Sequence, residues 1–123
     1  MHLLITGTFT VALTWTALYR FLLDLPARLG MQVIFGPAVH KREGDWLGFV
    51  IIAESHVSIH TSGATAFVDV FSCKEFEVET ALAYIGECFQ LSTMDVHLLE
   101  RIMPAKEPVR YPNLPIPQVV GVS

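Results

Sequence analysis

The chain has 123 residues, of which 52% are hydrophobic and 16% charged, and its formal net charge is -4. A chain of this length is expected to fold as one domain around its own core, without a disulfide or structural metal. The negative charge and the lack of a dense Lys or Arg cluster argue against nucleic acid as a partner.

The N-terminal third predicts a strand over residues 2–9 and an amphipathic helix over residues 11–24. Apolar side chains recur at intervals of three or four from Val11 to Leu25. The segment is long enough to span a bilayer. It nevertheless contains five threonines and Arg20, and no basic region precedes it. We therefore predict buried elements of a cytoplasmic protein, with no membrane segment.

The middle of the chain predicts strands that form an antiparallel sheet. Residues 31–39 form a short strand, and the charged residues 40–45 a solvated turn. Residues 46–61 are strand-like throughout, and the unbroken apolar run 47–53 indicates a central strand buried on both faces. A short turn containing Gly then leads into a strand over residues 66–73, which predicts a hairpin.

The last elements complete an α+β fold. Residues 76–90 carry one apolar stripe and form a helix, and residues 94–102 alternate as a final strand. This order predicts a two-layer sandwich, with helices on one face of a largely antiparallel sheet. Residues 1–103 form the domain, and residues 104–123 a proline-rich tail. The apolar excess predicts an interface between copies of the chain in a homo-oligomer.

The stretch AESHVSIHT, residues 53–61, gathers the side chains best suited to chemistry. His56 and His60 are possible zinc ligands, but four residues of extended chain span about 13 Å, which is too far for one ion. A serine hydrolase is disfavoured, because alternation places Ser55 and His60 on opposite faces of an intact strand. We expect no metal, and we expect Cys73 and Cys88 to be separate reduced thiols.

The sequence ESHVSIHT at residues 54–61, followed by VDVFSC at residues 68–73, resembles the signature of prokaryotic S-adenosylmethionine decarboxylase proenzymes. These are pyruvoyl-dependent enzymes of polyamine and spermidine biosynthesis, and the resemblance, together with the apolar excess, implies a homodimer. The resemblance implies that the Ser55 hydroxyl attacks the carbonyl of Glu54 to give an ester. Elimination then cuts the chain between Glu54 and Ser55 and leaves a pyruvoyl group derived from Ser55.

The resemblance also implies roles in catalysis. The pyruvoyl carbonyl forms a Schiff base with the substrate amine and accepts the electrons left when CO₂ departs, so neither PLP nor a metal is needed. His60 assists the self-cleavage, and Cys73 returns a proton to the decarboxylated carbon. The side chains of His56, Ser58 and Asp69 are possible substrate contacts. The remaining histidines and Cys88 lack motif support, and we expect them to be packing or surface residues: His2, His40 and His97.

One departure from the family pattern leaves the substrate open. Typical members follow His-Thr with an aromatic or similar residue and Pro-Glu, whose carboxylate holds the ribose of S-adenosylmethionine, whereas this chain has Ser62, Gly63, Ala64 and Thr65. The first hypothesis is decarboxylation of S-adenosylmethionine. The second is a decarboxylase of the same family that acts on a basic amino acid, arginine or ornithine. The third is an unprocessed, non-catalytic binding homologue.

Overall fold

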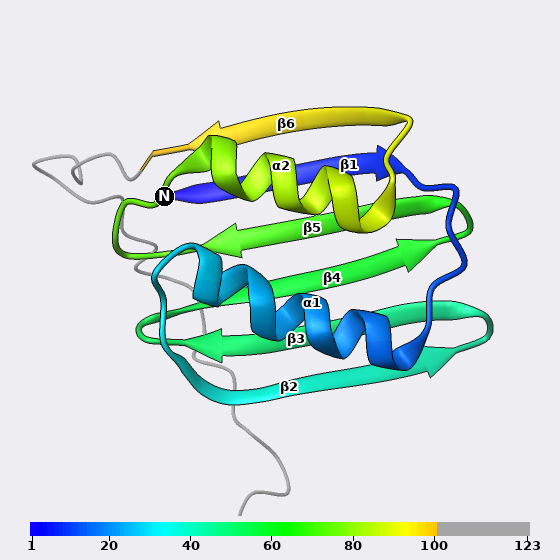
Figure 1. Cartoon of the computed structure of the whole chain (residues 1–123), viewed down its shortest axis with the longest axis horizontal. Helices are drawn as coiled ribbons and strands as arrows, with labels where there is room; N and C mark the ends of the chain where they lie inside the picture. The colour runs from blue at the N-terminus through cyan, green and yellow to red at the C-terminus, as the bar shows by residue number, and fades with distance from the viewer. Residues whose placement is uncertain (101–123) are drawn as a thin grey trace, which may run out of the picture.

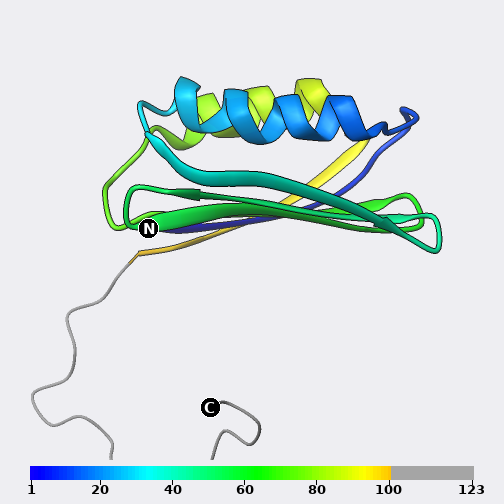
Figure 2. The same cartoon turned by 90° about the horizontal axis from the view of Figure 1, so that it is seen from below.

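Two helices cover one face of a six-stranded antiparallel sheet (Figure 1, Figure 2). The computed structural model describes residues 1–100. The elements are β1 (His2–Thr8), α1 (Trp15–Arg28), β2 (Val33–Arg42), β3 (Asp45–Ile52), β4 (Ser55–Ser62), β5 (Thr65–Phe71), α2 (Val78–Phe89) and β6 (Thr93–Leu99). The predicted two-layer α+β fold is confirmed.

The strand order is β2-β3-β4-β5-β1-β6, and every neighbouring pair is antiparallel. β2 to β5 form a meander of successive hairpins, and β1 inserts between β5 and β6. The predicted hairpin corresponds to β4 and β5, whose pairing ends at Ser62 opposite Thr65. Figure 1 shows β4 and β5 at the centre of the sheet, where neighbouring strands fix their positions.

The core lies between the sheet and the helices. Strand residues alternate strictly, so one side chain in two faces α1 and α2. The fully buried side chains on this side of the sheet include Leu3, Ile5, Val50, Ile52, Val57, Ile59, Val68 and Val70. The two helices meet at Phe21, whose ring lies 5.9 Å from that of Tyr84 and 4.8 Å from that of Phe89.

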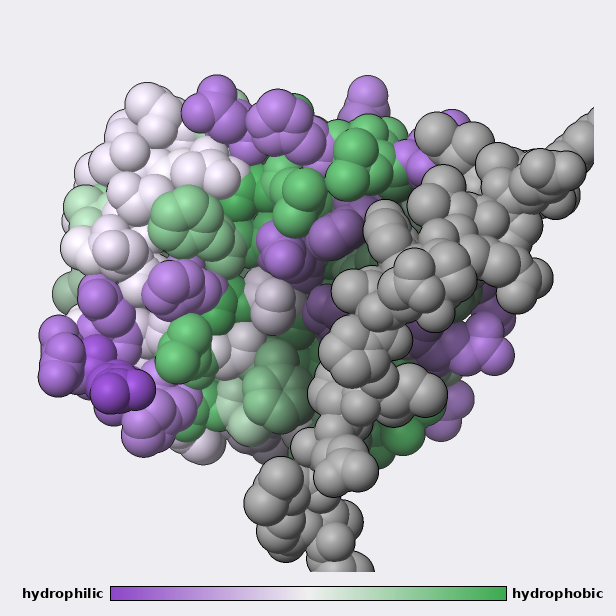
Figure 3. Space-filling model, turned by 180° about the vertical axis from the view of Figure 1, so that it is seen from behind, coloured by the Kyte–Doolittle hydropathy of each residue, from purple (hydrophilic) through white to green (hydrophobic). Residues whose placement is uncertain are grey.

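No helix covers the opposite face of the sheet, which we call the open face (Figure 2). Its large apolar side chains are partly exposed, among them Leu47, Phe49, Ile51 and Phe67. Figure 3 looks onto this face and shows hydrophobic and hydrophilic side chains intermixed. The prediction that residues 47–53 are buried on both faces is therefore wrong for the single chain, because helices cover only one side.

The prediction of a continuous strand over residues 46–61 is also wrong. β3 ends at Ile52 and β4 begins at Ser55, with a turn at Ala53 and Glu54. Glu54 has φ 65°, in the left-handed region that non-glycine residues rarely adopt. The chain thus reverses at the peptide bond that the resemblance marks for cleavage.

The first helix begins later and ends later than predicted. It starts at Trp15, because the Thr14 hydroxyl accepts a hydrogen bond from the Ala17 nitrogen at 3.1 Å and caps the helix. Pro26 lies in the last turn instead of ending the helix. From the predicted stripe, Leu18, Leu22 and Leu25 are buried, whereas half of the Trp15 side chain is exposed.

The bounds of the other strands differ less. β2 continues to Arg42, so that the predicted turn over residues 40–45 shrinks to Glu43 and Gly44, both at positive φ. β6 ends at Leu99. The predicted tail, residues 104–123, lies outside the described residues. Within residues 1–100, no helix is long and apolar enough to cross a membrane.

Candidate active site

The turn between β3 and β4 brings Glu54, Ser55 and Cys73 together. The Ala53 nitrogen donates to the carbonyl oxygen of Gln32 at 2.9 Å, which fixes the turn against the start of β2. Glu54 then takes its positive φ. A non-glycine residue in this conformation carries strain of about 1 kcal/mol or more. The peptide bond to Ser55 is therefore held in an unfavourable local geometry by the strands around it.

The carbonyl oxygen of Glu54 accepts two side-chain hydrogen bonds. One comes from the Ser55 hydroxyl. The other comes from the thiol of Cys73, whose Sγ lies 3.2 Å away. The main-chain nitrogen of Cys73 in turn donates to Ser55 Oγ at 2.9 Å. A hydroxyl, a thiol and a strained carbonyl are thus arranged around one peptide bond.

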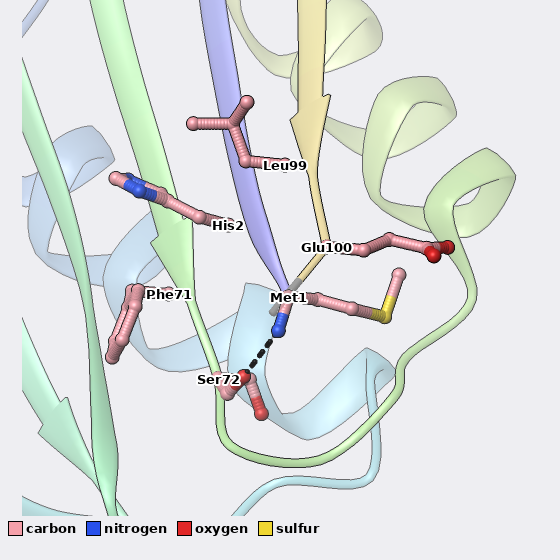
Figure 4. A pocket seen from close by; sticks show the side chains of 6 residues that line it. All are labelled: Met1, His2, Phe71, Ser72, Leu99 and Glu100. Atoms are coloured by element: carbon pink, nitrogen blue, oxygen red, sulfur yellow. Dashed lines mark hydrogen bonds between the residues drawn. The ribbon is translucent and has the colours of Figure 1, made fainter. Parts of the chain in front are cut away.

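The β4–β5 register places Cys73 in this group. His56 pairs with Phe71, and continuing the register by two residues brings Cys73 opposite Glu54. The backbone before Cys73 is fixed on its other side by β1, because the Ser72 nitrogen donates to Met1 O at 2.9 Å and the Met1 nitrogen donates to Ser72 O at 2.8 Å. Figure 4 shows this second bond beside a cavity of about 200 Å³.

This arrangement is suited to acyl transfer within the chain. Ser55 Oγ is a nucleophile next to the preceding carbonyl carbon, and attack would close a five-membered ring. The Cys73 thiol is positioned to stabilise negative charge that develops on the Glu54 oxygen. Cys73 is exposed, so that the thiol is also accessible to a ligand.

His60 lies far from Ser55 in the same chain. Five residues of β4 separate the two, a distance of about 16 Å at about 3.3 Å per residue. Ser55 pairs with Ile52, a residue of the helix-covered side, whereas His60 pairs with Leu47 of the open face. The predicted separation of Ser55 and His60 onto opposite faces is confirmed. His60 stacks on Phe67, with ring centroids 5.7 Å apart.

His56, Ser58 and Asp69 also lie on the open face, away from the Glu54 carbonyl. The ring of His56 stacks on Phe71, with centroids 5.6 Å apart. Ser58 stands directly across from Asp69 in the β4–β5 pair. Asp69 Oδ2 lies 3.8 Å from His2 Nε2, so that the carboxylate has a nearby imidazole partner.

The open face contains a hollow of about 570 Å³ over β2, β3 and β4. It is lined by Ala38, Val39, His40, Leu47, Gly48, Phe49, Ser58, Ile59 and His60. His40 is predicted from the sequence to be a packing or surface residue, yet it lines this hollow. The signal that could have found it is alternation, since His40 and His60 both lie across from Leu47. A volume of this size is in the range of small-molecule sites.

Thr61 of the motif has a structural part that the sequence pattern does not indicate. Thr61 is 1% exposed, and its Oγ1 accepts a hydrogen bond from the Trp46 nitrogen at 2.9 Å. This bond joins the start of β3 to the end of β4. Thr61 is therefore a structural member of the motif, not a reactive one.

The second cysteine lies away from this site, in α2. Burial is the largest cause that raises the pKa of the Cys88 thiol. Burial is likewise the main cause that raises the pKa of Tyr84, whose hydroxyl lies 3.1 Å from Asp24 Oδ2. Both groups remain protonated at neutral pH. Within residues 1–100, no group of three or more His, Cys, Asp or Glu side chains could hold a metal ion.

Comparison with known proteins gives concordant matches. The family model for S-adenosylmethionine decarboxylase matches residues 12–102. S-adenosylmethionine decarboxylase proenzymes from two strains of Acidithiobacillus ferrooxidans are 47% identical over 55 residues, which span 40% of this chain and 41% of theirs. The crystal structure of adenosylmethionine decarboxylase from Aquifex aeolicus has the same fold, with a TM-score of 0.68 and 21% identity over 89% of this chain and 95% of that one.

Proposed function

Because the chain belongs to the S-adenosylmethionine decarboxylase family, we propose that it is a proenzyme that cuts itself between Glu54 and Ser55 and becomes a pyruvoyl-dependent decarboxylase. The observation that carries the proposal is the environment of the Glu54 carbonyl. The Ser55 hydroxyl and the Cys73 thiol both contact its oxygen, and Glu54 itself has φ 65°.

The cleavage proceeds in two steps. Ser55 Oγ bonds to the Glu54 carbonyl carbon, its proton passes to the Ser55 nitrogen, and the carbon–nitrogen bond breaks to leave an ester. Loss of the Ser55 α-proton then expels the Glu54 carboxylate, and hydrolysis of the resulting enamine releases ammonia and leaves the pyruvoyl group. The strain at Glu54 is relieved when the peptide bond opens, which favours the first step.

Cys73 serves both stages in this account. Before cleavage its thiol donates to the Glu54 oxygen at 3.2 Å and stabilises the charge that forms there. After cleavage the same thiol lies next to the new N-terminus of residue 55, where it returns a proton to the decarboxylated carbon. A reduced thiol is required for both, which is consistent with a cytoplasmic location.

The position of Ser55 fits a pyruvoyl precursor, because its hydroxyl and the scissile carbonyl are in contact. Once formed, the group supplies an electron sink for the carbanion that loss of CO₂ leaves on the substrate. Neither PLP nor a metal is part of the proposal. His56, Ser58 and Asp69 lie on the open face, and we keep them as candidate substrate contacts in the dimer proposed below.

We further propose that the enzyme is a homodimer formed through the open face. Six strands at about 4.8 Å each and seven residues at about 3.4 Å each give a flat area of roughly 700 Å², which side-chain relief increases. Stable interfaces bury about 800 Å² per partner. His60 is about 16 Å from Ser55 within one chain, so its help in cleavage requires a second copy that brings it to the Glu54 turn.

S-adenosylmethionine is the substrate we favour, from the family and from the name of the relatives. The β4–β5 turn supports keeping a basic amino acid as the second candidate. The turn is tight, with Gly63 at φ 58° and its nitrogen bonded to Asp45 Oδ1 at 3.0 Å. It therefore has no room for the Pro-Glu element, and the ribose would need another partner.

Release of CO₂ from carboxyl-labelled substrates tests whether S-adenosylmethionine or a basic amino acid is the substrate. Purified, cleaved protein is supplied in turn with S-adenosylmethionine, arginine, ornithine and lysine, and Ser55→Ala protein is the blank. We expect release from S-adenosylmethionine alone. Release only from a basic amino acid would overturn the favoured substrate and leave the pyruvoyl chemistry intact. Absence of release from all four, with no cleavage of the chain, would support the third candidate, a non-catalytic binding homologue.

A further inference from the structure

All five histidines of the chain lie on the open face of the sheet. Each is directly across from an apolar residue of that face: His2 from Phe71 and Leu99, His40 and His60 from Leu47, His56 from Ile51, and His97 from Leu4. Four of them are exposed in the single chain, and His2 is partly so. The surface assigned above to a second copy is therefore apolar and rich in imidazole.

The charged side chains of this face are few. Among the described residues they are Arg42, Asp45, Asp69 and Asp95. Asp69 lies against His2, at 3.8 Å. Asp95 is on β6, two residues before His97 on the same side. Asp45 already accepts the Gly63 nitrogen at the end of the hairpin, and Arg42 is directly across from Asp45.

The histidines consequently fall into two groups. His2 and His97 each have a carboxylate next to them. No described carboxylate lies directly across from His40, His56 or His60. Asp69, which is diagonal to His56 and His60, lies 3.8 Å from His2 Nε2. Asp45, which is diagonal to His40 and His60, accepts the Gly63 nitrogen and lies across from Arg42. His56 and His60 stack instead on phenylalanine rings. Glu43 and Glu54 lie in the hairpin turns at the ends of the face.

We propose that two copies associate through the open face with His40 and His56 uncharged, so that protonation of these imidazoles separates the dimer. His60 is left out, because the proposed dimer places it at the Glu54 turn of the other copy. The proposal rests on the homodimer proposed above. Enclosing an imidazolium between apolar sheets without a carboxylate partner is unfavourable, because the charge loses its water. Association therefore releases protons, and acid opposes it.

The direction of the pH dependence follows from the linkage between proton binding and association. Free imidazole side chains titrate near pH 6.5. Where imidazole is uncharged in both states, association does not depend on pH. At lower pH the separated chains bind protons that the dimer excludes, so the dissociation constant rises as the pH falls. Each excluded proton raises the dissociation constant of the dimer by about tenfold per pH unit. We therefore expect a rise of at least about tenfold per unit below about pH 6.5.

Sedimentation equilibrium of the purified full chain between pH 8 and pH 5 tests the proposal, with far-UV circular dichroism at each pH to verify the fold. We expect a dimer at pH 8 whose dissociation constant rises at least about tenfold between pH 6.5 and 5.5 while the fold persists. A dimer equally tight at both ends of the range would overturn the inference and leave the homodimer standing. A monomer at every pH would instead refute the homodimer of the proposed function.

Matched variants identify the histidines responsible. In the variant with His40→Gln and His56→Gln, we expect the dimer to persist at pH 5.5. In the control with His2→Gln and His97→Gln, we expect the wild-type pH dependence. If the first variant does not fold, His40→Gln alone should lower the slope of the dissociation constant against pH. An unchanged slope in that variant, or pH dependence lost only in the control, would contradict the assignment.

Discussion

At the scale of single residues, two side chains meet at one main-chain carbonyl, and their placement depends on one turn. Ser55 and Cys73 meet at the Glu54 carbonyl because the β4–β5 hairpin closes tightly at Gly63. The motif predicts Ser55 and Cys73 as the reactive residues. It could not predict that the thiol contacts the scissile carbonyl, since this depends on strand register, which a short change in the turn would shift.

Replacement of Cys73 tests the first of its two roles. Cys73→Ala removes the donor to the Glu54 oxygen, and we expect self-cleavage to slow about tenfold, the effect of losing one weak hydrogen bond in the transition state. The rate is followed by mass spectrometry on freshly made proenzyme. Cys73→Ser keeps a donor and should cleave faster than Cys73→Ala, whereas Cys88→Ala should match wild type. Equal rates in Cys73→Ala and wild type would remove this role.

The two thiols should also differ in reactivity. Cys73 is exposed, whereas burial raises the pKa of the Cys88 thiol and so lowers its thiolate fraction at a given pH. With iodoacetamide at pH 8, we expect Cys73 to be modified at least about tenfold faster than Cys88. Peptide mapping measures both rates in one sample, and faster labelling of Cys88 would show that its surroundings are not as described.

At the scale of elements, periodicity predicted most of the fold and missed its most important break. The apolar stripes identified both helices, and alternation placed Ser55 and His60 on opposite faces. The break between β3 and β4 carries no turn signal, because neither Ala53 nor Glu54 favours a reversal. Tertiary contacts impose it, including the bond from Ala53 to Gln32. The prediction that residues 47–53 are buried on both faces fails for the single chain, because the outer face of this run is exposed. In our proposal a second copy of the chain covers that face.

Thr61 provides a test of how the motif region is held together. In Thr61→Val the buried Trp46 nitrogen loses its acceptor, and we expect the free energy of unfolding to fall by about 1–3 kcal/mol. Thr61→Ser, which retains the hydroxyl, should lose less, and Ser62→Ala at the exposed neighbouring position should lie within about 0.5 kcal/mol of wild type. Urea unfolding at fixed protein concentration gives the comparison. A stability of Thr61→Val equal to that of Thr61→Ser would refute the importance of this bond.

At the scale of the whole molecule, the sheet has one face covered by helices and one face open (Figure 2). The composition predicted more apolar surface than one small core could bury. In our proposal the same surface also supports self-cleavage, because association through it brings His60 of one chain to the Glu54 turn of the other. Dimer formation and self-cleavage should therefore be coupled.

A charge placed on the open face should separate the copies. Phe49 is 40% exposed there, and Leu23 is 37% exposed on α1, so Phe49→Glu and Leu23→Glu add the same charge at similar exposure on opposite sides of the molecule. We expect Phe49→Glu to be monomeric and to cleave slowly, and Leu23→Glu to remain dimeric. Light scattering after gel filtration at pH 8 measures both. A dimeric Phe49→Glu protein would place the interface elsewhere.

The central claim, self-cleavage at Ser55, is tested most directly by the intact mass of the purified protein. We predict two species, residues 1–54 ending in a free carboxylate and residues 55–123 lighter by one ammonia than a chain that begins with serine. Ser55→Ala should give one species of 13.7 kDa, less the mass of the hydroxyl oxygen. A single uncut wild-type chain that persists on prolonged incubation would contradict the claim.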